Sequence, residues 1–172
     1  MAFSANARAR FHAIVPPNLD DAYRLAKRLV GEAEAEDVVQ DAAIRALKAL
    51  ELTGVTNARA WFLAIVRNGA LTTLARRGAR LEEPEGLDAV EEYLMDPNAD
   101  IEADLIARQD GAAVRAAVDA LPVPLRETLV LRDVNDLSYR EIADALKTPI
   151  GTVMSRLARA RAALAKTLGG RA

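Results

Sequence analysis

The chain lacks most of the residues from which catalytic and metal sites are built. Its 172 residues contain no cysteine and a single histidine, His12. Disulfides, thiolate zinc sites and cysteine nucleophiles are therefore excluded, and one histidine alone makes neither a metal site nor a catalytic pair. We expect His12 to be a surface residue. The sequence predicts no enzymatic activity, no catalytic residue, no metal, no cofactor and no small-molecule substrate.

Long apolar runs and aromatic residues are also scarce. No stretch approaches the ~20 apolar residues of a membrane span, and residues 1–17 show no apolar core followed by a cleavage site. This predicts a cytoplasmic protein without membrane insertion. Only 4% of the residues are aromatic, whereas Ala, Leu, Arg and Glu are abundant. That composition favours helix over strand and predicts an all-α fold.

The net charge of −2 conceals an uneven distribution. Residues 1–81 carry twelve Lys or Arg and eight Asp or Glu, a net charge of +4, and residues 105–172 carry eleven and seven, again +4. Residues 82–104 carry ten acids and no base. From Lys147 to the end there are six bases and no acid. Such asymmetry indicates an acidic linker between two mildly basic parts, the second of which suits an anionic partner.

The acidic stretch also divides the chain. It contains Pro84, Gly86 and Pro97, which is typical of a linker. We therefore predict two small helical bundles, residues 1–80 and 105–172, joined by an acidic linker over 81–104.

Local signals predict the helices of the first bundle. One amphipathic helix covers 19–30 and ends at Gly31, and a second runs from about 33 to 52. Asn57 is predicted to cap a long helix through 75, on which Asn68 closes a buried hydrogen bond.

In the second bundle, helices are predicted over 101–120 and 125–132. Ser138 and Glu141 have the spacing of a capping box, which opens a short helix to about 146. Thr148, as the N-cap before Pro149, is predicted to open the last helix, to about 168.

The last two predicted helices are a short helix, a tight turn and a longer helix, which is typical of a helix-turn-helix. On a helical wheel, the apolar residues of the final helix gather on one face, and the opposite face carries hydroxyls and cations. Short donors followed by arginines suit the reading of a DNA groove. The alternative is a plain amphipathic helix with a solvated polar face. The apolar face holds Val153, Leu157, Ala160, Leu164 and Leu168, and the polar face Thr152, Ser155, Arg156, Arg159 and Lys166.

Two further helices carry residues with more than one interpretation. In the helix over 33–52, Ile44 lies among Asp37, Gln40, Asp41, Arg45 and Lys48 on the polar side. It is either an ordinary surface residue or the anchor of a partner site. In the helix after Asn57, packing in the core is favoured for Trp61 over stacking on a base.

Three motifs follow one another along the chain. The first is AEDVVQD at 35–41 followed by IRA at 44–46, and the second is AWFLAIVRN at 60–68. The third combines LSYREIA at 137–143 with PIGTVMSRLARAR at 149–161. Together they resemble the extracytoplasmic-function (group 4) RNA polymerase sigma factors. The resemblance implies that residues 1–80 are sigma region 2 and residues 105–172 are sigma region 4.

The resemblance also implies partners and roles. The partners would be core RNA polymerase, promoter DNA and an anti-sigma factor. The loop 53–57 and the start of the following helix would take an unpaired −10 base, and the last helix would enter the −35 major groove. The residues implied are Asp37, Gln40, Asp41, Ile44, Arg45 and Lys48 for core polymerase; Thr56, Asn57, Arg59, Trp61, Arg67, Arg76 and Arg77 for the −10 element; and Arg140, Thr152, Met154, Ser155, Arg156 and Arg159 for the −35 element.

A second function stays open from the residues alone. A stand-alone helix-turn-helix regulator would dimerise through the first bundle and bind a duplex operator without polymerase. Promoter-specific transcription with core polymerase distinguishes the two.

Overall fold

The structure, a computed structural model, describes residues 2–82 and 111–170. These residues are helical and include no strand, which confirms the all-α prediction. No helix among them is long and apolar enough to cross a membrane. The elements are α1 (Ala5–Ile14), η1 (Pro16–Asn18), α2 (Leu19–Val30), α3 (Glu32–Leu50), α4 (Ala58–Arg76), α6 (Gly111–Asp119), α7 (Val123–Leu129), η3 (Val130–Val134), α8 (Tyr139–Leu146) and α9 (Ile150–Gly169).

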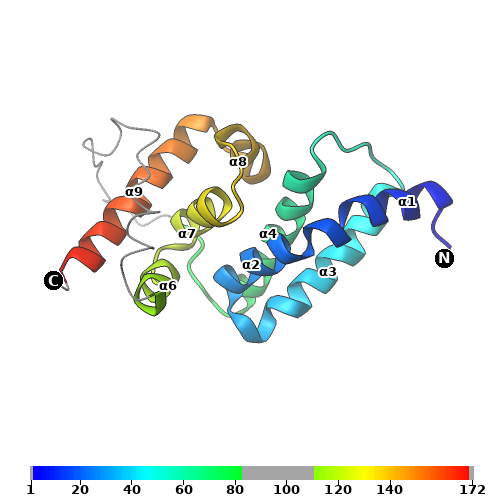
Figure 1. The fold of residues 1–172 in the computed structure, drawn as a ribbon. Coiled ribbons are helices and arrows are strands. Elements are labelled where there is room, and N and C mark those ends of the chain that lie inside the picture. The colour runs from blue at the N-terminus through cyan, green and yellow to red at the C-terminus, as the bar shows by residue number, and fades with distance from the viewer. Residues whose placement is uncertain (1, 83–110, 171–172) are drawn as a thin grey trace.

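The N-terminal bundle is built on α2, α3 and α4, which pack against one another (Figure 1). Leu25 and Leu29 of α2 and Phe62 and Leu63 of α4 are buried in the common core. Small buried residues on α3, such as Ala42, allow the helices to approach closely. The bounds predicted for α2 are confirmed: Gly31, with φ +89°, ends it in a conformation that favours glycine.

Helix α1 is a feature that the sequence analysis did not predict. Ser4 caps it, accepting a hydrogen bond at Oγ from the Ala7 amide at 3.1 Å. Only Ala7 and Ile14 of this helix are buried. Because two buried residues make no recognisable apolar stripe, the helix has no strong pattern in the sequence.

The C-terminal bundle contains the predicted capping box. The Ser138 hydroxyl accepts from the Glu141 amide, and the Glu141 carboxylate accepts from the Ser138 amide. The prediction that Thr148 caps the last helix is wrong. Pro149, extended at φ −60° and ψ 150°, is the N-cap, and the Thr148 amide instead donates to the Ala143 carbonyl at the end of α8.

A π-helical turn, η3, follows α7 directly, so the helix predicted over 125–132 is only partly regular. Residues 83–104 of the linker predicted over 81–104, and residues 101–110 of the helix predicted over 101–120, lie outside the described residues.

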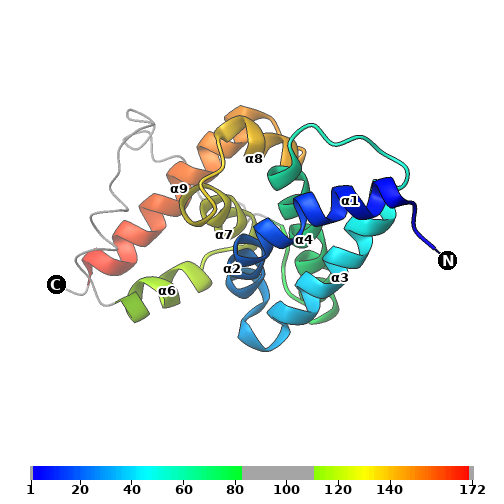
Figure 2. The same ribbon diagram turned by 45° about the vertical axis from the view of Figure 1, so that its right-hand side comes forward.

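The two bundles contact each other through α2, which packs on α7 and η3, and through α4, which packs on α8. Figures 1 and 2 both show α7 lying beside α2. Asn135 is fully buried at this junction and donates from Nδ2 to the Asp21 carbonyl at 3.0 Å. The two bundles therefore share one continuous hydrophobic core among the described residues.

Candidate nucleic-acid interface

The exposed face of α3 presents one apolar residue among charges. Its opposite face, including Ala35 and Ala46, is buried in the bundle. Ile44 is 54% exposed, as predicted, and no described segment covers it. An exposed isoleucine ringed by charges has the composition of a partner-binding anchor. The surrounding exposed residues are Asp37, Gln40, Asp41, Arg45 and Lys48.

The loop between α3 and α4 leads into a well-defined helix start. Thr56 is exposed, and Asn57 caps α4 by accepting from the Ala60 amide at 3.1 Å, as predicted. The Nδ2 group of Asn57 also donates to Glu141 of α8 at 2.6 Å. Asn57 therefore links the start of α4 to the C-terminal bundle.

Two arginines of α4 are engaged in the same junction. Arg59 donates to Asp21 at 2.8 Å and to the Asn135 carbonyl. Arg67 forms a bidentate pair with Glu127, at 2.6 and 2.9 Å. The Arg67 side chain is 19% exposed and that of Glu127 only 3%. Three of the residues predicted at the −10 element thus hold the two bundles together in this arrangement.

Asn68, predicted to close a buried hydrogen bond, is instead exposed. Its Oδ1 accepts from Arg67 at 3.1 Å. The stripe on which the sequence placed it reaches the surface at this turn, so the prediction is wrong.

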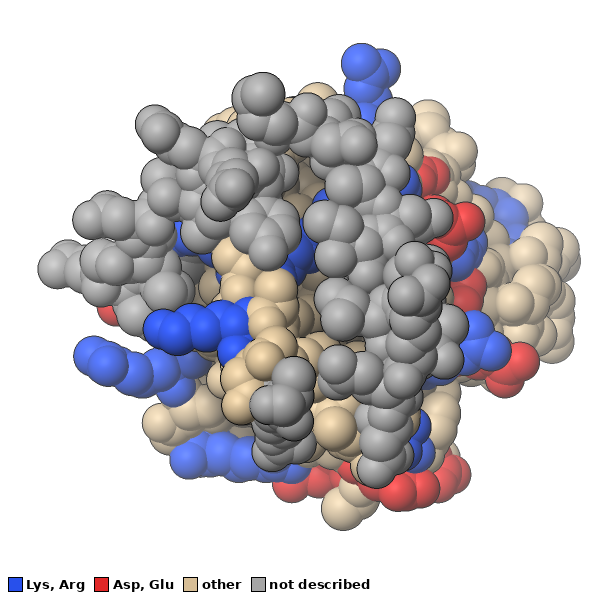
Figure 3. Space-filling view, turned by 60° about the vertical axis from the view of Figure 1, so that its left-hand side comes forward, with Lys and Arg blue, Asp and Glu red and all other residues tan. Residues whose placement is uncertain are grey.

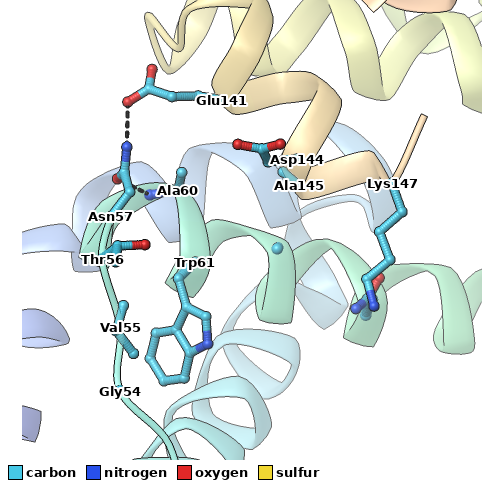
Figure 4. A pocket seen from close by; sticks show the side chains of 12 residues that line it. Gly54, Val55, Thr56, Asn57, Ala60, Trp61, Glu141, Asp144, Ala145 and Lys147 are labelled. Carbon is cyan, nitrogen blue, oxygen red and sulfur yellow. Dashed lines mark hydrogen bonds between the residues drawn. The ribbon is translucent and has the colours of Figure 1, made fainter. Parts of the chain in front are cut away.

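A cleft of about 280 Å³ lies between the α3–α4 loop, α4 and α8. Figure 4 shows the half-buried indole of Trp61 at its α4 wall, with Glu141 and Asp144 of α8 opposite. Trp61 packs against the core on one side and faces the cleft on the other. A partly exposed aromatic beside an amide and a hydroxyl can stack on a flat ring and hydrogen-bond to its edge.

The two arginines at the end of α4 differ in their surroundings. Arg76 is exposed. Arg77 pairs with Glu34 at 2.7 Å and donates to the Val30 carbonyl at 2.7 Å, so it ties α4 to the α2–α3 turn. Arg77 therefore has a structural role within the bundle.

Helix α9 has the two faces that the sequence predicts. All five predicted core residues, from Val153 to Leu168, are buried. Arg140 at the start of α8 is exposed, and Met154 is 38% exposed. No acidic residue occurs in α9, and Figure 3, viewed from the side of the C-terminal bundle, shows Lys and Arg side chains projecting from the described surface. The partly buried residues of the polar face are Thr152, Ser155, Arg156 and Arg159.

The pKa of Glu141 lies below its ordinary value. The largest cause is the hydrogen bond from the Ser138 amide, and the Asn57 amide group adds to it. Both donors stabilise the ionised carboxylate. Glu141 therefore stays charged at neutral pH, where it caps α8 and holds Asn57.

Several residues at the junction were not found from the sequence. Glu127, Asn135 and Asp21 are buried or half-buried partners of α4 and of each other. Arg67 and Glu127 are 60 positions apart, and no local pattern pairs residues so distant. The one signal in the sequence was Glu127 itself, near the apolar residues Leu125 and Leu129 of α7, because a carboxylate that becomes buried there needs a cationic partner.

Comparison with known proteins identifies the family. The model of "Sigma-70 region 2" matches residues 14–80, and that of "Sigma-70, region 4" matches residues 111–164. The chain is 36% identical to the RNA polymerase sigma-H factor of Pseudomonas aeruginosa over 78% of this chain and 73% of that protein. It belongs to the sigma-70 family, in the ECF group.

Other relatives agree with this membership. The ECF sigma factor SigE of Mycolicibacterium smegmatis is 37% identical over 86% of this chain, which spans 57% of SigE. Among solved structures, the chain is similar to the sigma factor RpoE of Bartonella quintana, in complex with the anti-sigma factor NepR. The TM-score is 0.69 with 23% identity, over 92% of this chain and 96% of that one. At that identity the likeness concerns the fold alone.

Proposed function

We propose that this ECF sigma factor binds core RNA polymerase and directs initiation at promoters that it reads at two elements. The observation that carries the proposal is the combination of the exposed Ile44 face on α3 with the acid-free, cationic helix α9. The first surface offers an apolar anchor for a protein, and the second offers donors for DNA. The matches to region 2, over residues 14–80, and to region 4, over residues 111–164, support the proposal because they cover the two parts of the chain that carry these surfaces.

The −10 contacts are assigned to region 2. Thr56, Asn57 and Trp61 line the cleft beside the α3–α4 loop, where an unpaired base can stack and hydrogen-bond. Arg59, Arg67, Arg76 and Arg77 supply positive charge along α4 and its end. Because Asn57, Arg59 and Arg67 are bonded to the C-terminal bundle, their contacts with DNA require α4 to separate from α7 and α8.

The −35 contacts are assigned to region 4. Helix α9 would enter the major groove, with Thr152, Met154, Ser155, Arg156 and Arg159 toward the bases and phosphates, and Arg140 at the start of α8 near the backbone. The boundaries we propose are residues 1–80 for region 2, 81–104 for the linker and 105–172 for region 4. An anti-sigma factor is the proposed regulatory partner, by analogy with the solved complex of the structural relative.

Substitution of Ile44 tests the assignment of the polymerase surface. Ile44→Asp places a charge at the centre of the face and is expected to weaken core binding by about thirtyfold, the loss typical of a hot-spot residue. Leu52→Asp is the matched control, because Leu52 is also apolar and exposed, at 86%, but lies beyond the end of α3. Titration of labelled core polymerase measures both. Equal affinity of the two variants, with unchanged circular dichroism, would reject the α3 surface.

A further inference from the structure

The loop between α3 and α4 is held by a residue of another helix. Arg10 of α1 donates from Nη1 to the Leu50 carbonyl at 2.9 Å and from Nη2 to the Thr53 carbonyl at 2.7 Å. Leu50 is the last residue of α3, and Thr53 begins the loop. One guanidinium therefore bridges the end of the helix and the loop that follows it.

The Leu50 carbonyl, at the end of α3, has particular need of a donor. The last carbonyls of an α-helix have no partner within the helix, and the loop amides of Leu52 and Thr53 turn back to the Ala49 carbonyl instead. The negative end of the helix dipole also favours a cation at this place. Arg10 thus satisfies both carbonyls with a planar fork that a single ammonium cannot reproduce.

A second contact fixes α1 at the same end of α3. Ser4, the N-cap of α1, donates from its hydroxyl to Glu51 Oε2 at 2.8 Å and from its amide to Glu51 Oε1. These two bonds lower the pKa of Glu51. Two buried residues also pack α1 on the bundle: Ala7, which lies between Ser4 and Arg10 in the sequence, and Ile14, which follows Arg10. Helix α1 therefore braces the first residues of the loop with two side chains.

The far end of the loop is fixed independently, by the Asn57 cap of α4. Between Thr53 and Asn57 the backbone has no regular structure, and Gly54 and Thr56 are exposed. Val55 and Thr56 line the cleft beside Trp61. The position of this short span is consequently determined by its two anchors, Arg10 and Asn57.

We propose that Arg10 is a positioning residue for −10 recognition: it holds the loop 53–57 in the conformation that receives the unpaired base, without touching DNA itself. The inference rests on the proposed function, which assigns that loop to the −10 element. Without Arg10 the loop samples other conformations, and the reading conformation becomes a fraction of the population. Affinity for the cognate base falls by that fraction.

The test combines Arg10→Ala, Arg10→Lys and the control Arg8→Ala, since Arg8 is exposed on the same helix. Binding of single-stranded −10 oligonucleotides that differ at the unpaired base measures discrimination between cognate and non-cognate bases, using the complex with core polymerase. We expect Arg10→Ala to reduce that discrimination about fivefold, the value of one net hydrogen bond to the loop. Arg10→Lys should restore part of it, and Arg8→Ala should leave it unchanged.

Two further readouts separate this proposal from a general loss of structure and from failure of the proposed function. Core affinity should be the same in all variants, because the Ile44 face is distant in sequence and lies on the middle of α3. Hydrogen exchange at amides 53–57 should accelerate in Arg10→Ala, less so in Arg10→Lys, and not in Arg8→Ala. If the wild-type protein discriminates bases and Arg10→Ala does so equally well, the positioning role is refuted. If the wild-type protein itself shows no discrimination, the −10 assignment fails. If, in addition, hydrogen exchange at amides 53–57 is the same in Arg10→Ala as in the wild-type protein, the bracing of the loop is refuted as well.

Discussion

The Arg67–Glu127 pair provides a quantitative test of the junction between the bundles. Glu127 lies in the interior with its carboxylate held by two hydrogen bonds from the Arg67 guanidinium, so removal of the arginine deprives a buried charge of both bonds. Breaking a buried pair in this way costs about 3–5 kcal/mol. We therefore expect Arg67→Met, which keeps the aliphatic stem, to lower the free energy of unfolding by about 3 kcal/mol.

A double substitution isolates the charge from the packing. Replacing a buried pair by apolar residues of similar volume is often neutral, so Arg67→Met with Glu127→Leu should cost less than about 1 kcal/mol. Arg45→Met, at an exposed arginine of α3, is the control and should change stability by less than about 0.5 kcal/mol. Urea unfolding at pH 7, followed by circular dichroism, measures each value. A single variant that is as stable as the double one would contradict the docked arrangement.

Three further predictions concern α8 and α9. Because the pKa of Glu141 is lowered in the folded protein, its contribution to stability is complete above its ordinary value of 4.5 and is lost as the pH falls through the folded-state pKa. Glu141→Gln should therefore lower the melting temperature most at pH 7, by an amount that shrinks as the pH falls below 4.5, and a loss independent of pH would contradict this. Arg159→Ala should weaken −35 binding by about 1–3 kcal/mol, while Lys166→Ala, farther along the same helix, should not; footprinting measures both, and equal footprints would refute the groove-facing assignment. Leu157→Ala should cost about 2–5 kcal/mol of stability in urea unfolding, because Leu157 is 1% exposed, and a smaller loss would mean that α9 is loosely packed.

The elements with local signals could be predicted from the sequence. The structure confirms three helix ends predicted from single residues or pairs. The conformational preference of glycine predicts the end of α2 at Gly31, and side-chain capping predicts the starts of α4 at Asn57 and of α8 at the Ser138–Glu141 box. The apolar stripe of α9 likewise followed from its period. These features depend on residues within one or two turns of each other.

The remaining features depend on contacts between distant parts of the chain. Helix α1 could not be predicted because bonds from Ser4 and Arg10 to the end of α3 and the loop after it stabilise the helix, and these bonds span 40 to 47 positions. The predicted Thr148 cap is wrong, because the helix begins one residue later and Pro149, with its extended backbone, is the N-cap. The partners of Arg59 and Arg67 could not be predicted, because they are created only when the bundles pack.

Transcription in vitro with purified core polymerase tests the central claim most directly. The chain, core enzyme and a library of promoter fragments should yield discrete start sites that share two sequence elements, and core enzyme alone should yield none of them. Absence of those transcripts and of any association with core enzyme, together with protection of symmetric duplex sites by the chain alone, would contradict the account and favour a stand-alone helix-turn-helix regulator.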